Sequence, residues 1–167
     1  MKVNINYKGK SVELDIPDEK LEELVNEPKK TGWEKPNKGE VYCYLQRDSE
    51  LYKAHWANDD FDNTTYECGN CFTSKELAEN IARYQSLDLR IRRRIAEICE
   101  PIDWNTYGNR YSIVYNHAMK ELDWFESWHG EYAIWYCDTA EHAKQIIEEF
   151  KDDLTWFFTE FKDRMDG

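Results

Sequence analysis

Residues 72–78 read Phe-Thr-Ser-Lys-Glu-Leu-Ala, and residues 137–143 read Cys-Asp-Thr-Ala-Glu-His-Ala. In each stretch a strand-like end leads to a residue that can cap a helix, Thr73 in the first and Asp138 in the second. A glutamate stands three residues after each cap, which is the spacing of a capping box at a helix start. The two junctions therefore predict two long helices, each entered directly from a β-strand.

Apolar side chains recur at helical spacing behind both junctions. In the first helix they are Leu77, Ile81, Tyr84, Ile91, Ile95 and Ile98. In the second helix they are Ala143, Ile146, Ile147, Phe150, Leu154, Phe157, Phe158 and Phe161. A proline after the first pattern ends that helix, whereas the second would extend about 40 Å if it were unbroken.

Strand-like segments precede both junctions, at 41–46 and 51–56 before the first and at 111–115, 122–128 and 132–137 before the second. We therefore predict an α+β fold, with antiparallel β-strands and two long helices. The order strand, strand, helix occurs twice, and an internal duplication would explain it. The alternative is that unrelated strands leading into capped helices look alike.

A smaller element precedes this part of the chain. Residues 2–7 and 11–16 alternate polar and apolar positions, which is typical of a β-hairpin, and residues 17–28 predict a short helix bounded by prolines. The predicted divisions are a hairpin with a short helix (1–30), a linker (31–40), a strand–strand–helix unit (41–100) and the remaining strands with a long acidic helix (101–167).

The composition is that of a chain able to fold without a membrane. Of the 167 residues, 41% are hydrophobic and 15% aromatic, which is enough to build a core. No apolar run approaches the roughly 20 residues that span a bilayer, and the alternating start does not resemble a secretion signal. The five cysteines are an odd number, which favours free thiols in a reducing compartment. We expect a cytoplasmic protein.

The formal net charge is −12, and residues 121–167 carry 13 acidic and 4 basic side chains. Such a field repels nucleic-acid phosphates and anionic lipid, so direct binding to nucleic acid or to a membrane is disfavoured. The charge favours a partner with a basic surface. The alternative is that surplus acidity does no more than keep an aromatic-rich protein soluble.

An acidic ridge is the first candidate binding site. It lies on the last helix, largely opposite the apolar face, and comprises Glu149, Asp152, Asp153, Glu160 and Asp163. Carboxylates on successive turns stand about 5–6 Å apart, comparable to phosphates along a nucleic-acid strand. The ridge could therefore imitate a phosphate backbone and occupy a basic channel, as in a guide-RNA nuclease. The alternative is an ordinary solvated helix face.

A basic patch on the first long helix is the second candidate, and it comprises Arg83, Arg90, Arg92, Arg93 and Arg94. One interpretation is contact with nucleic-acid phosphates or with an acidic protein surface. The favoured alternative is pairing with the protein's own carboxylates, either within the chain or across a homodimer.

Metal and catalytic motifs are weak. Cys68 and Cys71 have the spacing of a zinc knuckle, but the other cysteines and the four histidines are scattered along the chain. Asp59, Asp60 and Asp62 lack the glycine and glutamate positions of a calcium-binding EF-hand loop. No nucleophile elbow, phosphate-binding loop or dinucleotide fingerprint is present. We expect neither a metal, nor a cofactor, nor catalytic residues.

The segment from Trp56 to Ala78 carries a family resemblance. It holds a tryptophan followed by asparagine and aspartates, then a tyrosine, then Gly-Asn-x-Phe-x-Ser-x-Glu-x-Ala at the start of a helix. This pattern resembles a segment of small phage and prophage accessory proteins of Gram-positive bacteria, a class that includes anti-CRISPR and other anti-defence proteins. Residues 134–147 resemble the closing segment of the same proteins.

The resemblance implies a phage-encoded protein in the cytoplasm of a bacterial host. We expect it to bind and inhibit a host defence complex, with a CRISPR nuclease as the favoured target. The alternatives are a nucleic-acid-associated accessory protein that acts through the basic patch, or a small enzyme that acts on a nucleotide signal.

Overall fold

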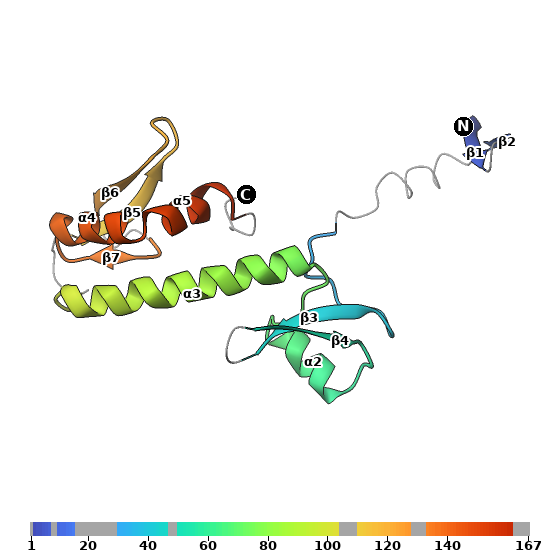
Figure 1. The fold of residues 1–167 in the computed structure, drawn as a ribbon, viewed down its shortest axis with the longest axis horizontal. Coiled ribbons are helices and arrows are strands. Elements are labelled where there is room, and N and C mark those ends of the chain that lie inside the picture. Colours follow the sequence, from blue (N-terminus) through green and yellow to red (C-terminus); the bar gives the residue numbers. More distant parts are fainter. Residues whose placement is uncertain are drawn as a thin grey trace.

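The computed structural model describes residues 2–7, 10–15, 30–46, 50–103, 110–127 and 133–161. The fold is α+β, as predicted (Figure 1). Within these residues no helix is long and apolar enough to cross a lipid bilayer. The elements are β1 (Lys2–Tyr7), β2 (Lys10–Asp15), β3 (Val41–Leu45), β4 (Leu51–His55), α2 (Asp60–Glu67), α3 (Lys75–Ile98), β5 (Arg110–Asn116), β6 (Glu121–Ser127), β7 (Tyr136–Cys137), α4 (Ala140–Glu149) and α5 (Lys151–Thr159).

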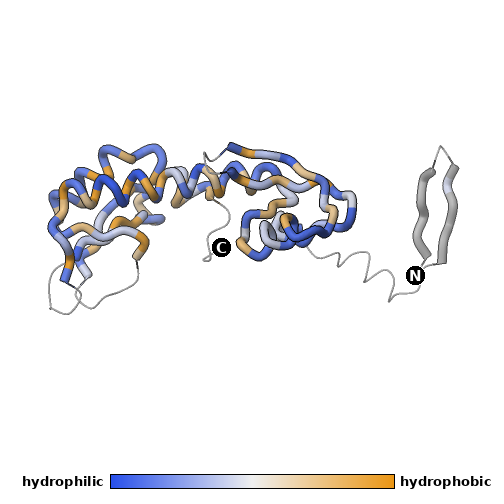
Figure 2. Tube along the Cα trace, turned by 90° about the horizontal axis from the view of Figure 1, so that it is seen from below, coloured by the Kyte–Doolittle hydropathy of each residue, from blue (hydrophilic) through white to orange (hydrophobic). Residues whose placement is uncertain are grey.

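The N-terminal hairpin is confirmed, because β1 and β2 pair antiparallel from Lys2 opposite Asp15 to Tyr7 opposite Lys10. The short helix predicted at 17–28 lies outside the described residues. Every apolar position predicted for the two long helices lies in or against a hydrophobic core. Figure 2 shows the alternation of hydrophobic and hydrophilic residues along the helices that produces this burial.

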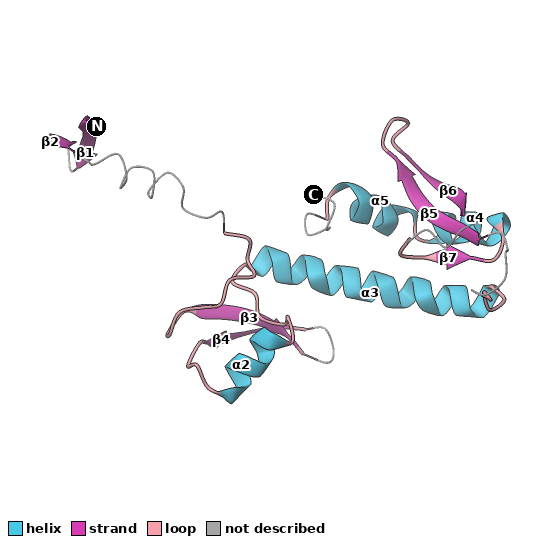
Figure 3. Cartoon of the chain, turned by 180° about the vertical axis from the view of Figure 1, so that it is seen from behind, coloured by secondary structure: helices cyan, strands magenta, loops and turns pink. Residues whose placement is uncertain are grey.

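Helix α3 is shared by two lobes (Figure 3). At its start, Leu77 and Ala78 pack with Cys43 and Phe72 of the β3–β4 lobe. Further along, its apolar residues belong to the core of the β5–β7 lobe, which also contains α4 and α5. Ile81 contacts both cores. The predicted boundary between residues 100 and 101 comes just after α3. Both lobes pack on this helix, so α3 belongs to both of the predicted units.

Residues 58–69 are polar and lack apolar periodicity, which predicts a loop, but the structure forms helix α2 there, so that prediction is wrong. Asp59 caps the helix by accepting a hydrogen bond from the backbone N–H of Asp62. The Asp62 carboxylate is buried and accepts from the Tyr42 hydroxyl at 2.7 Å and from the backbone N–H of Ala57 at 2.6 Å. These polar contacts hold the helix in place. Because they do not involve a row of apolar side chains, the sequence of α2 shows no apolar periodicity.

Residues 31–40, predicted as a linker, pack on the β3–β4 lobe. The backbone N–H of Thr73 donates to the carbonyl of Gly32 at 2.8 Å, and the Trp33 and Phe72 rings lie 5.1 Å apart. Gly32 has φ +94°, and a Cβ there would lie 2.8 Å from Cδ2 of Leu77. Only glycine can adopt this positive φ without strain and also leave the space beside Leu77 free of a Cβ atom.

The β5–β7 lobe has a three-stranded antiparallel sheet in the order β6-β5-β7, packed against α4 and α5. The single long helix predicted here is two helices, because the backbone at Phe150 departs from helical geometry (φ −115°, ψ 19°). The caps also lie one residue later than predicted. Ser74 caps α3 and Thr139 caps α4.

Both lobes have the same local topology. A hairpin is joined by a third segment that pairs antiparallel with the first strand, through Cys43 opposite Phe72 in one lobe and Tyr111 opposite Cys137 in the other. A capped helix follows, and its fourth residue is a fully buried alanine, Ala78 or Ala143. This match supports an internal duplication of the strand–strand–helix unit.

Candidate functional site

The predicted acidic ridge and basic patch contact each other. The Arg94 guanidinium donates two hydrogen bonds of 2.8 Å to the Glu149 carboxylate. Asp153 accepts from Arg83 at 3.0 Å and from Arg90 at 2.5 Å. Residue numbers fall along α3 as they rise along α4 and α5, so the helices run antiparallel. The arginines of the basic patch were expected to pair with carboxylates either within the chain or across a homodimer. The pairs described here lie within the chain.

The arginine side chains also cover aromatic rings. The guanidinium carbon of Arg83 lies 4.0 Å from the ring centroid of Trp156, and that of Arg90 lies 5.5 Å from the Phe150 centroid. The Arg90 hydrogen bond is the main cause of a lowered pKa at Asp153, and the Arg94 hydrogen bond lowers the pKa of Glu149. The interface therefore combines charge pairing with stacking on aromatic faces, which suits arginine.

The other ridge residues are placed differently. Asp152 is exposed in the first turn of α5, and Glu160 is exposed at its C-terminal cap, whereas Asp163 lies outside the described residues. Two further exposed carboxylates, on Glu141 and Glu148, lie on α4. Within the described part of the chain, none of these four carboxylates is in an ion pair. We call them the outer acidic face, which comprises Glu141, Glu148, Asp152 and Glu160.

The basic patch has little free charge. The Nε atom of Arg92 lies 2.8 Å from both carboxylate oxygens of Asp88, one turn earlier on α3. Asp88 also accepts a hydrogen bond from the buried Trp135 indole at 2.9 Å, which ties α3 to the β5–β7 lobe. Arg93 is exposed. Four of the five predicted arginines are thus held by carboxylates within the chain.

Exposed aromatic side chains lie on both lobes, and in the β5–β7 lobe the exposed one is Phe125 on strand β6 rather than on α4 or α5, with 54% of its surface exposed. In the β3–β4 lobe, Phe61 is 53% exposed and Tyr52 is 37% exposed, and the Tyr44 ring contacts both at centroid distances of 5.4 and 6.0 Å. Near the acidic residues of α5, Trp156 is buried. The aromatic residues that could anchor a partner are therefore not at the centre of the outer acidic face.

The predicted zinc-knuckle cysteines do not form a ligand set. Cys68 is exposed after α2, whereas Cys71 is buried against Tyr42 and Trp56, and burial raises the pKa of the Cys71 thiol to about 11. Among the described residues, the one group with metal-binding geometry is elsewhere: Cys99, Asp138 and His142. We call this group the Cys–Asp–His cluster.

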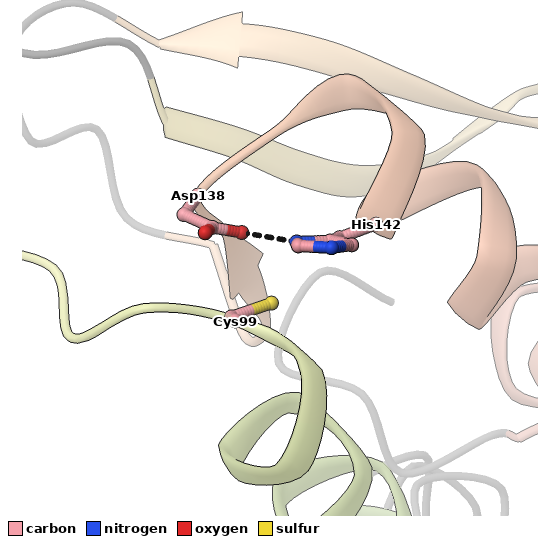
Figure 4. A group of neighbouring side chains, drawn as sticks. All are labelled: Cys99, Asp138 and His142. Atoms are coloured by element: carbon pink, nitrogen blue, oxygen red, sulfur yellow. Dashed lines mark hydrogen bonds and ion pairs between the residues drawn. The ribbon is translucent and has the colours of Figure 1, made fainter.

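Three elements position the Cys–Asp–His cluster (Figure 4). Cys99 ends α3, Asp138 follows β7, and His142 lies in the first turn of α4. Asp138 accepts from the backbone N–H of Glu100 at 2.9 Å, and its other oxygen lies 2.6 Å from Nδ1 of His142. Burial raises the pKa of Asp138, but hydrogen bonds from His142, Glu100 and Cys99 outweigh it and lower that pKa to about 2.

Sequence reasoning missed this cluster. The sequence predicts Asp138 as a helix cap, and His142 is one of four histidines scattered along the chain. The signal available was their spacing of four residues at a helix start, which places both side chains on one face. Cys99 is distant in sequence, and only the docking of α3 brings it to this face.

No protein-family model, curated protein or solved structure matches this chain. The function is therefore inferred from the contacts described above and from the sequence pattern at residues 56–78.

Proposed function

We propose that this protein binds a basic, nucleic-acid-binding surface of another macromolecule and thereby inhibits a host defence complex. The observation that supports this is the internal pairing of Arg83, Arg90 and Arg94 with Asp153 and Glu149. This pairing offsets most of the positive charge of these three arginines, whereas the carboxylates of the outer acidic face are not offset by an ion pair among the described residues. A surface of this sign attracts a basic partner and repels nucleic acid.

The outer acidic face follows a nearly continuous helical path. Phe150 interrupts the helix, but its backbone N–H donates to Ile146 at 3.0 Å and its carbonyl accepts from Leu154 at 2.8 Å. Helical hydrogen bonding thus continues on both sides of the break. Glu148 and Asp152 accordingly stand about one turn apart, near the 5–6 Å spacing expected for such a pair.

The alternative of nucleic-acid binding through the basic patch is less favourable. Phosphates would have to compete with carboxylates that already hold four of the five arginines. The bidentate pair of Arg94 with Glu149 is the strongest of these contacts in geometry. A phosphate contact at Arg94 would leave that carboxylate without its partner.

The resemblance of residues 56–78 to phage accessory proteins supports the choice of target. A CRISPR nuclease fits the charge argument as well, since such enzymes hold nucleic acid in a positively charged channel. The target class therefore rests on the resemblance, and the binding mode rests on charge.

The test measures target-DNA binding by purified CRISPR nuclease–guide RNA complexes, with and without this protein. We expect the protein to reduce DNA binding, and to do so less as salt rises. The double variant Asp152→Lys/Glu160→Lys should lose most of the inhibition. The matched control Glu67→Lys/Glu121→Lys makes the same change in net charge at exposed sites off the outer acidic face and should retain it.

Two results would contradict the proposal. One is salt-sensitive binding of the protein itself to naked DNA or RNA in a gel shift. The other is inhibition that both double variants weaken equally, because that would indicate a non-specific effect of net charge.

A further inference from the structure

The Cys–Asp–His cluster places three different metal-ligating groups at one point of the surface, where the end of α3, the end of β7 and the start of α4 meet (Figure 4). We propose that Cys99, Asp138 and His142 bind a Zn²⁺ ion. This site is independent of the outer acidic face and of the function proposed for it.

The donor set suits zinc in its chemistry. Zinc binds thiolate, imidazole and carboxylate in tetrahedral sites, and three protein ligands with one open position are common. Softer copper ions share the thiolate, but magnesium and calcium prefer oxygen ligands alone. The fourth position is assigned to water, because Cys137 is fully buried and does not belong to the group of three.

The distances allow a metal with small movements. One ligand atom from each of the three residues lies within 4.8 Å of the others. Ligands of a tetrahedral zinc ion stand about 3.3–3.8 Å apart, as follows from metal–ligand distances of about 2.0–2.3 Å. The His142–Asp138 contact of 2.6 Å must open by roughly 1 Å. All three side chains are partly accessible, so an ion can enter.

The second copy of the topology indicates that the fold does not require these side chains. At the corresponding junction of the β3–β4 lobe, Phe72 pairs with the first strand, Thr73 follows it, and Leu77 lies in the first turn of the helix. Asp138 and His142 occupy the places of Thr73 and Leu77. The same junction thus forms without a ligand at either position, and the ligating residues are particular to one lobe.

The test uses the full-length, reduced protein, stripped of metal and titrated with Co²⁺ and then Zn²⁺. We expect one ion per chain, a thiolate-to-cobalt charge-transfer absorption in the near ultraviolet and the intense visible bands of tetrahedral cobalt. Zinc should displace the cobalt and remove both signals. An absence of the thiolate absorption would overturn the proposal, whatever the variants do.

Variants locate the site. Cys99→Ser, Asp138→Asn and His142→Gln should each weaken zinc binding by about 100-fold or more, beyond the range for loss of an outer-shell partner. Asp138→Asn keeps an oxygen that accepts from Glu100, so the junction should stay folded while the ligand is lost. The matched controls Cys68→Ser and His55→Gln remove an exposed thiol and an exposed imidazole elsewhere and should leave affinity unchanged.

Circular dichroism separates ligand loss from unfolding in each variant. Zinc affinity that survives in a folded Asp138→Asn and a folded His142→Gln would refute the site. So would equal losses of affinity in the Cys99→Ser variant and the Cys68→Ser control.

Discussion

The β3–β4 lobe and the β5–β7 lobe share one topology but stabilise it differently. In the β3–β4 lobe helices contact both faces of the hairpin, α2 through Asp62 on the Tyr42 face and α3 through Leu77 and Ala78 on the Cys43 face. Its charged centre is the buried Asp62 carboxylate. The β5–β7 lobe instead has a row of surface ion pairs and the Cys–Asp–His cluster.

Comparing the two lobes distinguishes the residues that this topology requires from the positions at which it accepts different side chains. Both lobes keep a hydroxyl cap, Ser74 or Thr139, and a buried alanine four residues later. Other equivalent positions differ in kind, such as Leu77 in one lobe and His142 in the other. The shared residues are those that start the helix and let it approach the sheet, and the residues that differ include two of the three candidate ligands, Asp138 and His142.

The largest effect is expected where the two lobes meet, on α3. Gln85→Pro should lower the free energy of unfolding by about 3 kcal/mol or more, because it removes a helical hydrogen bond and forces the ring against the Ile81 carbonyl. Gln85 is exposed, so no packing is lost with its side chain. Denaturant unfolding followed by circular dichroism measures the change, with Gln85→Ala as control. If the proline variant unfolds like the control, α3 does not couple the lobes.

A core substitution at equivalent positions sharpens the comparison. Ile146 in α4 is fully buried, and Ile81 in α3 is partly buried between the two cores. Ile146→Ala should cost about 2–5 kcal/mol of unfolding free energy, and Ile81→Ala about half as much. Both are measured by chemical denaturation. Equal costs would indicate that Ile81 supports both cores fully and that the lobes form one cooperative unit.

Much of this arrangement follows from the sequence, and the rest depends on contacts between distant residues. Apolar periodicity placed the helices and their buried faces, because burial is periodic within one element. It missed α2, whose formation rests on a buried carboxylate, Asp62, held by Tyr42 from another strand. It missed the break at Phe150 because the apolar spacing continues across it.

The candidate sites show the same limit. The acidic ridge and the basic patch were each predicted from local spacing, and their mutual pairing arises only from the antiparallel packing of α3 against α4 and α5. Cys99 joins Asp138 and His142 for the same reason. Local sequence patterns identify the candidate side chains, whereas the tertiary packing determines which of them are in contact.

Two neighbouring aspartates test the division between structural and free carboxylates. Asp153→Ala should cost about 1 kcal/mol of unfolding free energy, since it leaves Arg83 and Arg90 without their shared partner in a partly exposed site. Asp152→Ala should change stability by less than about 0.5 kcal/mol, as is usual for an exposed surface residue. Thermal unfolding of both variants gives the difference. Equal effects would show that the ion pairs do not stabilise the β5–β7 lobe.

The smallest expected effect is a change with pH in the difference in unfolding free energy between the Asp153→Ala and Asp152→Ala variants. Arg90 and Arg94 hold the pKa values of Asp153 and Glu149 below their ordinary 3.8 and 4.5. The unfolded chain therefore binds protons at a higher pH than the folded chain, so the stability from these pairs is present above the ordinary pKa values and is lost as pH falls through the lowered ones. In the β3–β4 lobe the pKa of Asp62 is lowered too, because hydrogen bonds from Tyr42 and the backbone outweigh its burial.

Acid unfolding should then be shallower in Asp153→Ala than in the wild type, but not abolished, since Asp62 and Glu149 still titrate. Unfolding free energies measured by denaturant from neutral pH to about pH 3 give the two slopes. Asp152→Ala should follow the wild type throughout. An Asp153→Ala slope equal to that of the wild type would show that Asp153 contributes little to the acid sensitivity, which would then come from other carboxylates with lowered pKa values, such as Asp62, Asp138 and Glu149.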